Sequence, residues 1–414
     1  ELVYRAQDPA VVGLGLAAIR DVIAYAKYDN DARFPVDHGI AVGVSQTGRF
    51  LRHFLYQGFN TDEERRPAYD GIYAITAGAG RGSFNHRFAQ PSRDAHRYSA
   101  FFYPTDIFPF TSRVQHDPRT WRSDGLLAHQ HDTTHTPKTF YVNTGYEYWG
   151  RAASLIHTTP DGSADVAPLQ NERVYHLASA QHFPWQFPPE PDMQLGSDPD
   201  VYRGNPLDQS VNYRALLIRL AEWVEGEAPP PSRYPRVADG DLVPIDDIDA
   251  PSIPDVVWPD VIHTAYRADF GPRWRTEGII NRQPPVLGGT FGLRAPQVDA
   301  LGNEVAGVQN VGLRAPLATY APWSLRLDAP ANHDEIADFW GTYIPLPATR
   351  AEKQSTGDPR PAIETLYDDR SDYMQQVRQA ANALIDEGFL LPDDRDRVIH
   401  RAEAAWDWVH PSAE

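Results

Sequence analysis

The chain has 414 residues, of which 41% are hydrophobic and 11% aromatic, a composition typical of a globular protein rather than a disordered one. Its 56 acidic and 38 basic residues give a net charge of −18, which argues against nucleic-acid binding, because that function needs clustered positive charge. The absence of Cys excludes disulfides, thiolate metal sites and a Cys nucleophile, and leaves the localisation open between a secreted or periplasmic and a cytoplasmic protein. No apolar run approaches the roughly 20 residues that a membrane-spanning helix needs.

Strands alternate with helices along the first half of the chain. Asp8 and Pro9 are suitable for the N-cap and the first position of a helix over residues 9–27. Short apolar runs typical of buried parallel strands follow at residues 40–45, 69–80, 138–145 and 173–179, with helices predicted at residues 49–58 and 207–225. This alternation predicts an α/β fold with a mostly parallel sheet flanked by helices, whose functional loops lie at the carboxyl ends of the strands.

Composition divides the chain into three predicted regions. Residues 1–226 form the α/β core, and an insertion at about 81–137, with little strand or helix period, is expected to act as a lid. A proline-rich break, "EAPPPSRYPR", opens a Pro/Gly-rich β decoration over residues 227–350. Residues 351–414 end the chain with two amphipathic helices.

The end of the first predicted strand has the features of a nucleophile elbow. The segment "GVSQTG" presents Ser45 between Gly43 and Gly48, immediately before a helix. In the usual G-x-S-x-G pattern small neighbours permit a sharp strand-to-helix turn, and here the second glycine is displaced by one position. The alternative is an ordinary serine in a strand-to-helix loop that caps the helix.

A serine nucleophile needs a base and an acid that orients the base, and in this fold they follow in that order along the chain. Glu147 follows the strand at 138–145, and His182 follows the strand at 173–179. Glu147 could instead pair with Arg151, four residues on. His176 is mid-strand and is expected to be a buried histidine, and Asp165 is a rival for the acid.

The predicted lid contains candidate substrate contacts. Arg81 and Arg87 could hold a substrate carboxylate, or else pair with Asp94 or Asp106. Aromatic side chains of the insertion could line an apolar pocket with Trp149 or form a small core of the lid itself, which is the expectation for most of them. They are Phe84, Phe88, Phe101, Phe102, Tyr103, Phe108 and Phe110.

A second cluster, "HQHDTTH", contains His129, His131, Asp132 and His135. His131 and His135 are four residues apart, which on a helix would suit a metal ion. Thr133, Thr134 and Pro137 disfavour a helix there, so a solvated His-rich loop is the expected interpretation. A metal-dependent hydrolase that uses the three histidines stays an alternative function.

The quoted motifs resemble the alpha/beta hydrolase superfamily, and more closely the bacterial group of alpha/beta hydrolase domain-containing proteins. The resemblance rests on "DPAVVGLGLAAIRD", "GVSQTGRFLRHFLYQGFN", "AGAGRGSFNHRFAQPSRD", "NTGYEYWGRAASLIHT" and the pair Gln181-His182. The elbow is also similar to that of glucuronoyl esterases, which have Arg and Lys where this chain has Gln46 and Arg49, and which use a Ser-Glu-His triad.

The resemblance implies that the sheet is incomplete, because several strands precede the nucleophile in that fold and only one helix does here. We therefore expect an N-terminal segment or a second chain to complete the sheet and to supply one donor of the oxyanion hole. Without it the sheet would expose a long apolar edge.

Together these features predict a serine hydrolase that cleaves a small-molecule or carbohydrate-linked carboxylic ester without a metal or organic cofactor. Ser45 is the expected nucleophile, His182 the base and Glu147 the acid. The backbone N–H of Gln46 is the expected oxyanion donor. A non-catalytic binding protein on a hydrolase scaffold is a further alternative.

Overall fold

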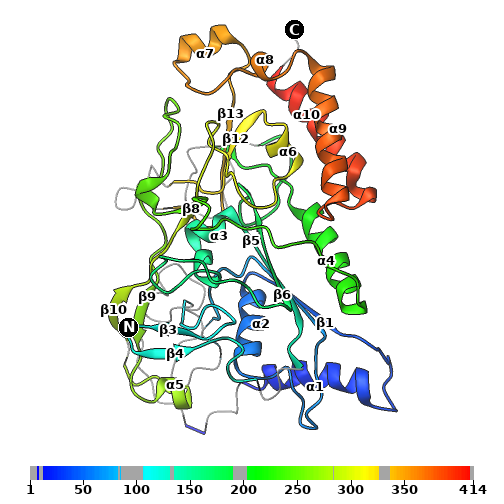
Figure 1. The fold of residues 1–414 in the computed structure, drawn as a ribbon, viewed down its shortest axis with the longest axis vertical. Helices are drawn as coiled ribbons and strands as arrows, with labels where there is room; N and C mark the ends of the chain where they lie inside the picture. Colours follow the sequence, from blue (N-terminus) through cyan, green and yellow to red (C-terminus); the bar gives the residue numbers. More distant parts are fainter. Residues whose placement is uncertain are drawn as a thin grey trace.

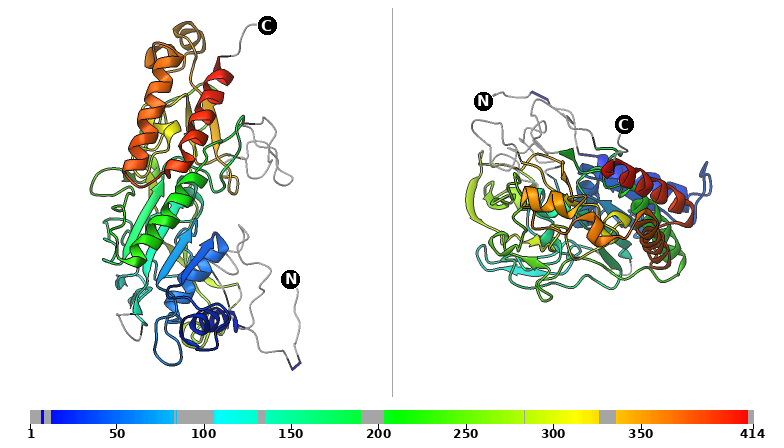
Figure 2. Two further views of the ribbon diagram at one scale, coloured as in Figure 1. Left: turned by 90° about the vertical axis from the view of Figure 1, so that its right-hand side faces the viewer. Right: turned by 90° about the horizontal axis from the view of Figure 1, so that it is seen from above.

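The computed structural model describes residues 7–8, 13–82, 84, 106–130, 135–189, 203–282, 284–325 and 336–410. The molecule is elongated, with helix α1 at one end and the C-terminal helices at the other (Figure 1). The left-hand view of Figure 2 shows the same arrangement from the side, with helix α4 (Ser210–Glu225) between the two ends. The catalytic residues predicted from the sequence, Ser45, Glu147 and His182, each follow a strand of the parallel sheet.

The central sheet is parallel and has four strands in the order β1-β2-β5-β6. Their bounds are β1 Ile40–Val44, β2 Gly71–Ile75, β5 Lys138–Thr144 and β6 Glu172–Leu177. Val44 lies beside Ile75, Ile75 beside Val142 and Val142 beside Tyr175, so all four strands end at one edge. This confirms the predicted α/β fold and brings the loops after β1, β5 and β6 to the same rim.

Helices α2 (Gln46–Tyr56) and α4 (Ser210–Glu225) pack on the sheet, α2 on β1 and β2 and α4 on β2 and β5. Helix α3 (Gly145–Gly150) follows β5 directly. Helix α1 spans Gly15–Tyr28, so the predicted start at Pro9 with Asp8 as the N-cap was wrong. Gly13 adopts a φ of 93°, a left-handed conformation through which an α-helix cannot run.

Strand β1 is an edge strand within the described residues, since it pairs with β2 alone. Its side chains Val42 and Val44 are 51% and 48% exposed, whereas every residue of β2 is buried. Strand β1 therefore has two half-exposed valines at a sheet edge, and a further strand that covers this edge stays a prediction.

The described part of the insertion at 81–137 contains a two-stranded hairpin, β3 (Gln115–Asp117) with β4 (Arg122–Asp124). Residues 227–350 are rich in short strands, as predicted, and these pair antiparallel. The strands are β8 Leu242–Val243, β9 Tyr266–Asp269, β10 Val286–Thr290, β11 Ala295–Pro296, β12 Ala318–Ala321 and β13 Thr342–Pro345, and β13 also pairs with β7, Arg203–Gly204, of the core. The short helices of this region are η5 Ile245–Asp247, α5 Trp274–Glu277 and α6 Val311–Arg314.

The chain ends in the two predicted amphipathic helices, α9 (Arg370–Asp386) and α10 (Arg395–Val409), which pack on each other. Shorter helices precede each of them: α7 Arg350–Thr356, α8 Ile363–Leu366 and η6 Pro392–Asp394. In the described ranges, no helix has both the length and the apolar character to cross a bilayer.

The three predicted regions share one hydrophobic core. Phe140 and Tyr175 of the sheet, Leu317 of the β-rich region and Leu384 of α9 belong to the same buried cluster. Burying these side chains together removes apolar surface of all three regions from water, which is the main favourable term in folding. The boundaries at 226 and 350 therefore mark changes in sequence composition, and the hydrophobic core continues across both of them.

Candidate active site

Ser45 occupies the sharp turn between β1 and α2. Its backbone has φ 55° and ψ −116°, a sparsely populated conformation for a residue with a side chain. Strain of this kind persists only where the surroundings fix it, and the Ser45 N–H donates to the Ile75 carbonyl at 2.8 Å. The side chain is half-buried at the carboxyl edge of the sheet. This geometry is that of a strand-to-helix elbow.

The two glycines that flank the elbow lack the space for a side chain. A Cβ on Gly43 would lie 2.5 Å from the Thr47 carbonyl oxygen, and one on Gly48 would lie 3.0 Å from that of Ile75. Thr47 braces the turn, because its Oγ1 accepts from the Val44 N–H at 2.7 Å and donates to the Val44 carbonyl at 2.8 Å. Gly48 thus meets the same steric need as the second glycine of the usual pattern.

Gln46 is the first residue of α2, and its side chain is exposed. The first N–H groups of a helix have no partner within the helix, and they lie at the positive end of its dipole. The helix begins at once after Ser45, whose carbonyl accepts from Arg49 N at 3.0 Å. The Gln46 N–H is therefore suited to stabilising an oxyanion formed at Ser45.

Glu147 and His182 form a buried pair. The Nδ1 atom of His182 lies 2.5 Å from Oε1 of Glu147, and their side chains are 1% and 0% exposed. The second oxygen of Glu147 accepts from the Thr144 N–H at 3.0 Å and from the Thr144 hydroxyl. These bonds form a capping box at the start of α3, so the helix cap fixes the carboxylate that holds the imidazole.

The environment keeps Glu147 ionised. Burial alone would raise its pKa, but the imidazole of His182 and the two donors of Thr144 outweigh burial and hold the pKa of Glu147 below its ordinary value. An ionised carboxylate accepts a hydrogen bond from the Nδ1–H group and leaves Nε2 of His182 as the basic nitrogen. That Nε2 atom is buried and has no hydrogen-bond partner among the described residues.

Aromatic rings enclose His182. Phe183, Phe339 and Tyr146 lie with ring centroids 4.5, 4.7 and 5.7 Å from the imidazole. The backbone N–H of His182 donates to the Phe339 carbonyl at 3.2 Å. An apolar, aromatic environment strengthens the hydrogen bond to Glu147 and restricts the ring to one orientation.

The three predicted triad residues thus follow three strands of one sheet and lie at its carboxyl rim. Glu147 and His182 are in contact, and no hydrogen bond joins Ser45 Oγ to His182 Nε2 in the part of the chain that the structure describes. Such catalytic hydrogen bonds are often formed only when a substrate binds.

Of the two arginines predicted to bind substrate, Arg81 is among the described residues and is buried. Arg81 is 3% exposed, donates to the carbonyls of Ile107 and Phe108 at 3.1–3.3 Å and stacks over Tyr56 at 3.7 Å. Burial lowers its pKa to about 10. Its donors fix the 107–108 backbone, so the geometry gives no support to a role as a carboxylate ligand. Arg87 lies outside the described residues.

Three of the aromatic residues predicted to contact substrate or line the lid are buried in the fold. Trp149 is 1% exposed and packs against Trp323 in a buried cluster, which corrects the expectation that its indole faces a substrate. Phe108 and Phe110 likewise belong to a buried cluster with Tyr141 of the sheet. Phe84 is half-buried, with its ring 5.6 Å from Phe50 of α2. The aromatics of the insertion between 88 and 103 lie outside the described residues.

The histidines of the alternative metal site are separate where they are described. His129 lies 3.1 Å from Asp124, and His135 Nδ1 lies 3.4 Å from the Thr61 hydroxyl. No group of three or more His, Asp or Glu side chains suited to a metal occurs within the described ranges. His131 and Asp132 lie outside them. The rival acid Asp165 accepts from two backbone N–H groups, those of Val237 and Ala238.

Sequence reasoning missed the residues that support the triad. Thr144 and Thr47 could have been recognised as capping and turn residues from their place beside Glu147 and Ser45. Glu304, which bonds the backbone of Ser179 in the loop before His182, and the carbonyl of Phe339 both come from the β-rich region. No local sequence pattern connects these two residues with His182.

The sequence profile of the alpha/beta hydrolase domain family matches residues 4–400. This chain belongs to the alpha/beta hydrolase domain family. The match covers the β-rich region and most of the C-terminal helices as well as the sheet, in agreement with their shared core. No curated protein and no solved structure matches the chain. Membership of the family supports a hydrolase in general.

Proposed function

We propose that the protein is a serine hydrolase that cleaves a carboxylic ester through Ser45, His182 and Glu147. The observation that carries the proposal is the buried Glu147–His182 pair, with His182 Nε2 left without a partner among the described residues, at the same rim as a strained serine elbow. Buried polar atoms are almost always paired, so an unpaired basic nitrogen is evidence for a reacting partner.

The reaction follows from this arrangement. His182 Nε2 takes the proton of the Ser45 hydroxyl as Oγ attacks the ester carbonyl. The tetrahedral intermediate expels the alcohol, which receives that proton from the imidazolium, and an acyl-Ser45 remains. Water then attacks the acyl group with the same base, releasing the carboxylic acid and restoring Ser45. Glu147 holds the tautomer and stabilises the imidazolium in both halves.

The oxyanion is bound by the Gln46 N–H at the start of α2, one donor of this kind being worth roughly 3 kcal/mol. A second donor and a strand that pairs with β1 come from an N-terminal segment or a second chain. Support for this part of the proposal is the exposed edge at β1, with Val42 and Val44 half exposed.

The substrate class is a small-molecule or carbohydrate-linked ester. Amides and lactones react through the same triad, and the shape of the pocket decides among them. The similarity of the elbow to glucuronoyl esterases makes esters of sugar acids one set to include in a screen.

A fluorophosphonate probe tests the nucleophile directly. We expect a covalent adduct on Ser45, mapped by peptide mass spectrometry, that is absent in Ser45→Ala and strongly slowed in His182→Ala. Esters would be hydrolysed by the wild type and by neither variant. A folded wild-type protein, assembled with any strand that covers β1, that takes no label at Ser45 would refute the proposal and favour a non-catalytic binding protein.

A further inference from the structure

The loop that carries His182 is held by a carboxylate from the β-rich region. Between the end of β6 and His182, Ser179 adopts a left-handed φ of 57°. Its N–H donates to Oε2 of Glu304, and its Oγ accepts from the Glu304 N–H at 2.9 Å. Two reciprocal bonds between the same residues fix the backbone where the chain turns from the strand toward the histidine. Ser179 and Glu304 are 0% and 1% exposed.

The same carboxylate also reaches the loop that carries Glu147. A Cβ built on Gly145 would lie 2.8 and 2.9 Å from the two carboxylate oxygens of Glu304. Gly145 is the first residue of α3, two positions before Glu147. Glu304 therefore contacts the acid loop and the histidine loop at once.

Glu304 is itself held in one orientation. His176 on β6 has its Nε2 2.8 Å from Oε2 of Glu304, and the His176 side chain is fully buried. The chain after Glu304 then runs beside β6, with the Val308 N–H donating to the His176 carbonyl at 2.7 Å and Ala178 N–H donating to the Val308 carbonyl at 3.1 Å. Glu304 is thus fixed to the sheet by the contact of its carboxylate with His176 and by the backbone bonds of the residues that follow it.

Glu304 has no direct contact with His182 or Ser45, so it acts through the two loops. We propose that Glu304 is a positioning residue of the active site, which sets the distance between Glu147 and His182 by bonding the histidine loop and packing against the acid loop. The proposal rests on the proposed function and adds a residue to it. Holding catalytic groups within a fraction of an ångström matters, because a misplacement of about 1 Å can cost about 100-fold in rate.

Two substitutions separate the geometry of the side chain from its charge. Glu304→Ala removes the carboxylate that bonds the Ser179 N–H and His176 Nε2, and leaves only the bond from the residue's own backbone N–H to Ser179 Oγ. We expect this variant to lower kcat by about 100-fold with KM little changed, since substrate does not touch this residue. Glu304→Gln keeps an oxygen that can accept from Ser179 and His176, and should retain most of the activity. If Glu304→Ala does not fold, Ser179→Gly is the substitute, since glycine tolerates the left-handed φ and removes only the Oγ bond; it should lower kcat by about 10-fold.

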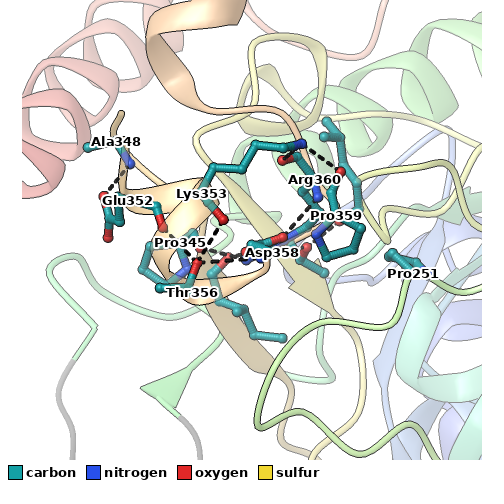
Figure 3. Close-up of polar contacts among 12 residues, drawn as sticks. Pro251, Pro345, Ala348, Glu352, Lys353, Thr356, Asp358, Pro359 and Arg360 are labelled. Carbon is teal, nitrogen blue, oxygen red and sulfur yellow. Dashed lines mark hydrogen bonds and ion pairs between the residues drawn. The ribbon is translucent and has the colours of Figure 1, made fainter. Parts of the chain in front are cut away.

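Asp358→Ala is the matched control, because it also removes a buried carboxylate. Asp358 is 7% exposed and binds Arg360 at 2.6–3.2 Å, in a group of polar contacts with Lys353 and Thr356 (Figure 3). Arg360 also bonds the carbonyls of Ile344 and Pro345. We expect Asp358→Ala to lower the melting temperature and to leave kcat unchanged.

A spectroscopic measurement reads the triad without substrate. The short Nδ1–H bond of His182 to Glu147 should give a low-field proton resonance, assigned by its loss in His182→Gln. We expect this resonance to shift or vanish in Glu304→Ala and to stay in Glu304→Gln and Asp358→Ala.

The outcomes separate the two proposals. A wild type that is labelled at Ser45, together with a folded Glu304→Ala variant that keeps both its kcat and its low-field resonance, would overturn the positioning role alone. A wild type that is not labelled at Ser45 would refute the serine hydrolase. A loss of kcat in Glu304→Ala that Asp358→Ala matches would also count against the positioning role, because general destabilisation would then explain it.

Discussion

Replacing Glu147 by Gln tests the assignment of the acid, because the structure dictates how the amide must lie. One oxygen of Glu147 accepts from the Thr144 N–H at 3.0 Å, and the other faces His182 Nδ1 at 2.5 Å. A backbone N–H can only donate, so the amide oxygen of Gln must take the Thr144 side. The amide nitrogen then faces Nδ1 and donates to it. This forces the proton of the imidazole onto Nε2, the nitrogen that has to accept the proton of Ser45.

The expected loss follows from this wrong tautomer. The same exchange in a serine protease triad lowers kcat by about 10⁴-fold, which corresponds to about 5.4 kcal/mol of transition-state stabilisation. We expect a similar loss in Glu147→Gln, measured as kcat for an ester that the wild type hydrolyses, with the fold checked by thermal unfolding. The side chain is nearly isosteric, so little of the effect can come from a cavity.

Asp165→Asn is the control, since Asp165 is the rival candidate for the acid in the sequence. Its oxygens accept from the backbone N–H groups of Val237 and Ala238 at 2.9 Å. Its kcat should match that of the wild type. The assignment would be refuted if Glu147→Gln kept more than about a tenth of the wild-type kcat, or if Asp165→Asn lost activity instead.

Two further predictions concern the packing beneath the site. Burial lowers the pKa of His157 to about 3, so between pH 6.5 and 3 the unfolded chain binds a proton that the folded chain does not, and stability falls as the pH falls. In urea unfolding from pH 6 to 4, His157→Gln should reduce the slope of unfolding free energy against pH by about 1.4 kcal/mol per pH unit. Equal slopes for the wild type and His157→Gln would contradict this prediction. Gly43→Ala should lower the free energy of unfolding by about 1–3 kcal/mol and slow the labelling of Ser45, because its Cβ would lie 2.5 Å from the Thr47 carbonyl oxygen. Gly15→Ala is the control and should leave stability unchanged, because no atom lies within 4 Å of the added Cβ. A neutral Gly43→Ala would show that the elbow can relax.

The elements that are local in sequence could be predicted from it. Ser45 was found because the strand, the small residues and the helix that make an elbow are consecutive in the chain. Glu147 and His182 were found because parallel strands end at one edge, so residues that follow them meet there. The contact between Glu147 and His182 is observed, and the chemistry at Ser45 stays a prediction.

The side chains assigned to substrate were less predictable. An aromatic or an arginine next to a rim loop has the same composition whether it lines a pocket or fills the core, and only packing decides. Trp149 packs against Trp323, and Arg81 donates hydrogen bonds to the carbonyls of Ile107 and Phe108. Buried donors of this kind are needed wherever an irregular backbone is removed from water. The sequence could not reveal which carbonyls lacked partners.

The sequence predicts that the β-rich region only decorates the core, because its hydrophobic residues have no clear helical periodicity. The loop that carries His182 nevertheless depends on this region for its hydrogen bonds. The His182 N–H is bonded to the Phe339 carbonyl at 3.2 Å, and Gln181 accepts from the Gly341 N–H at 2.9 Å. With Glu304 these contacts satisfy buried backbone groups of a loop that has no regular structure of its own. A loop buried in this way needs partners from elsewhere, since each unpaired group would cost about 1–3 kcal/mol. The β-rich region is therefore part of the framework of the proposed active site, because it supplies the hydrogen bonds that hold His182 at the rim.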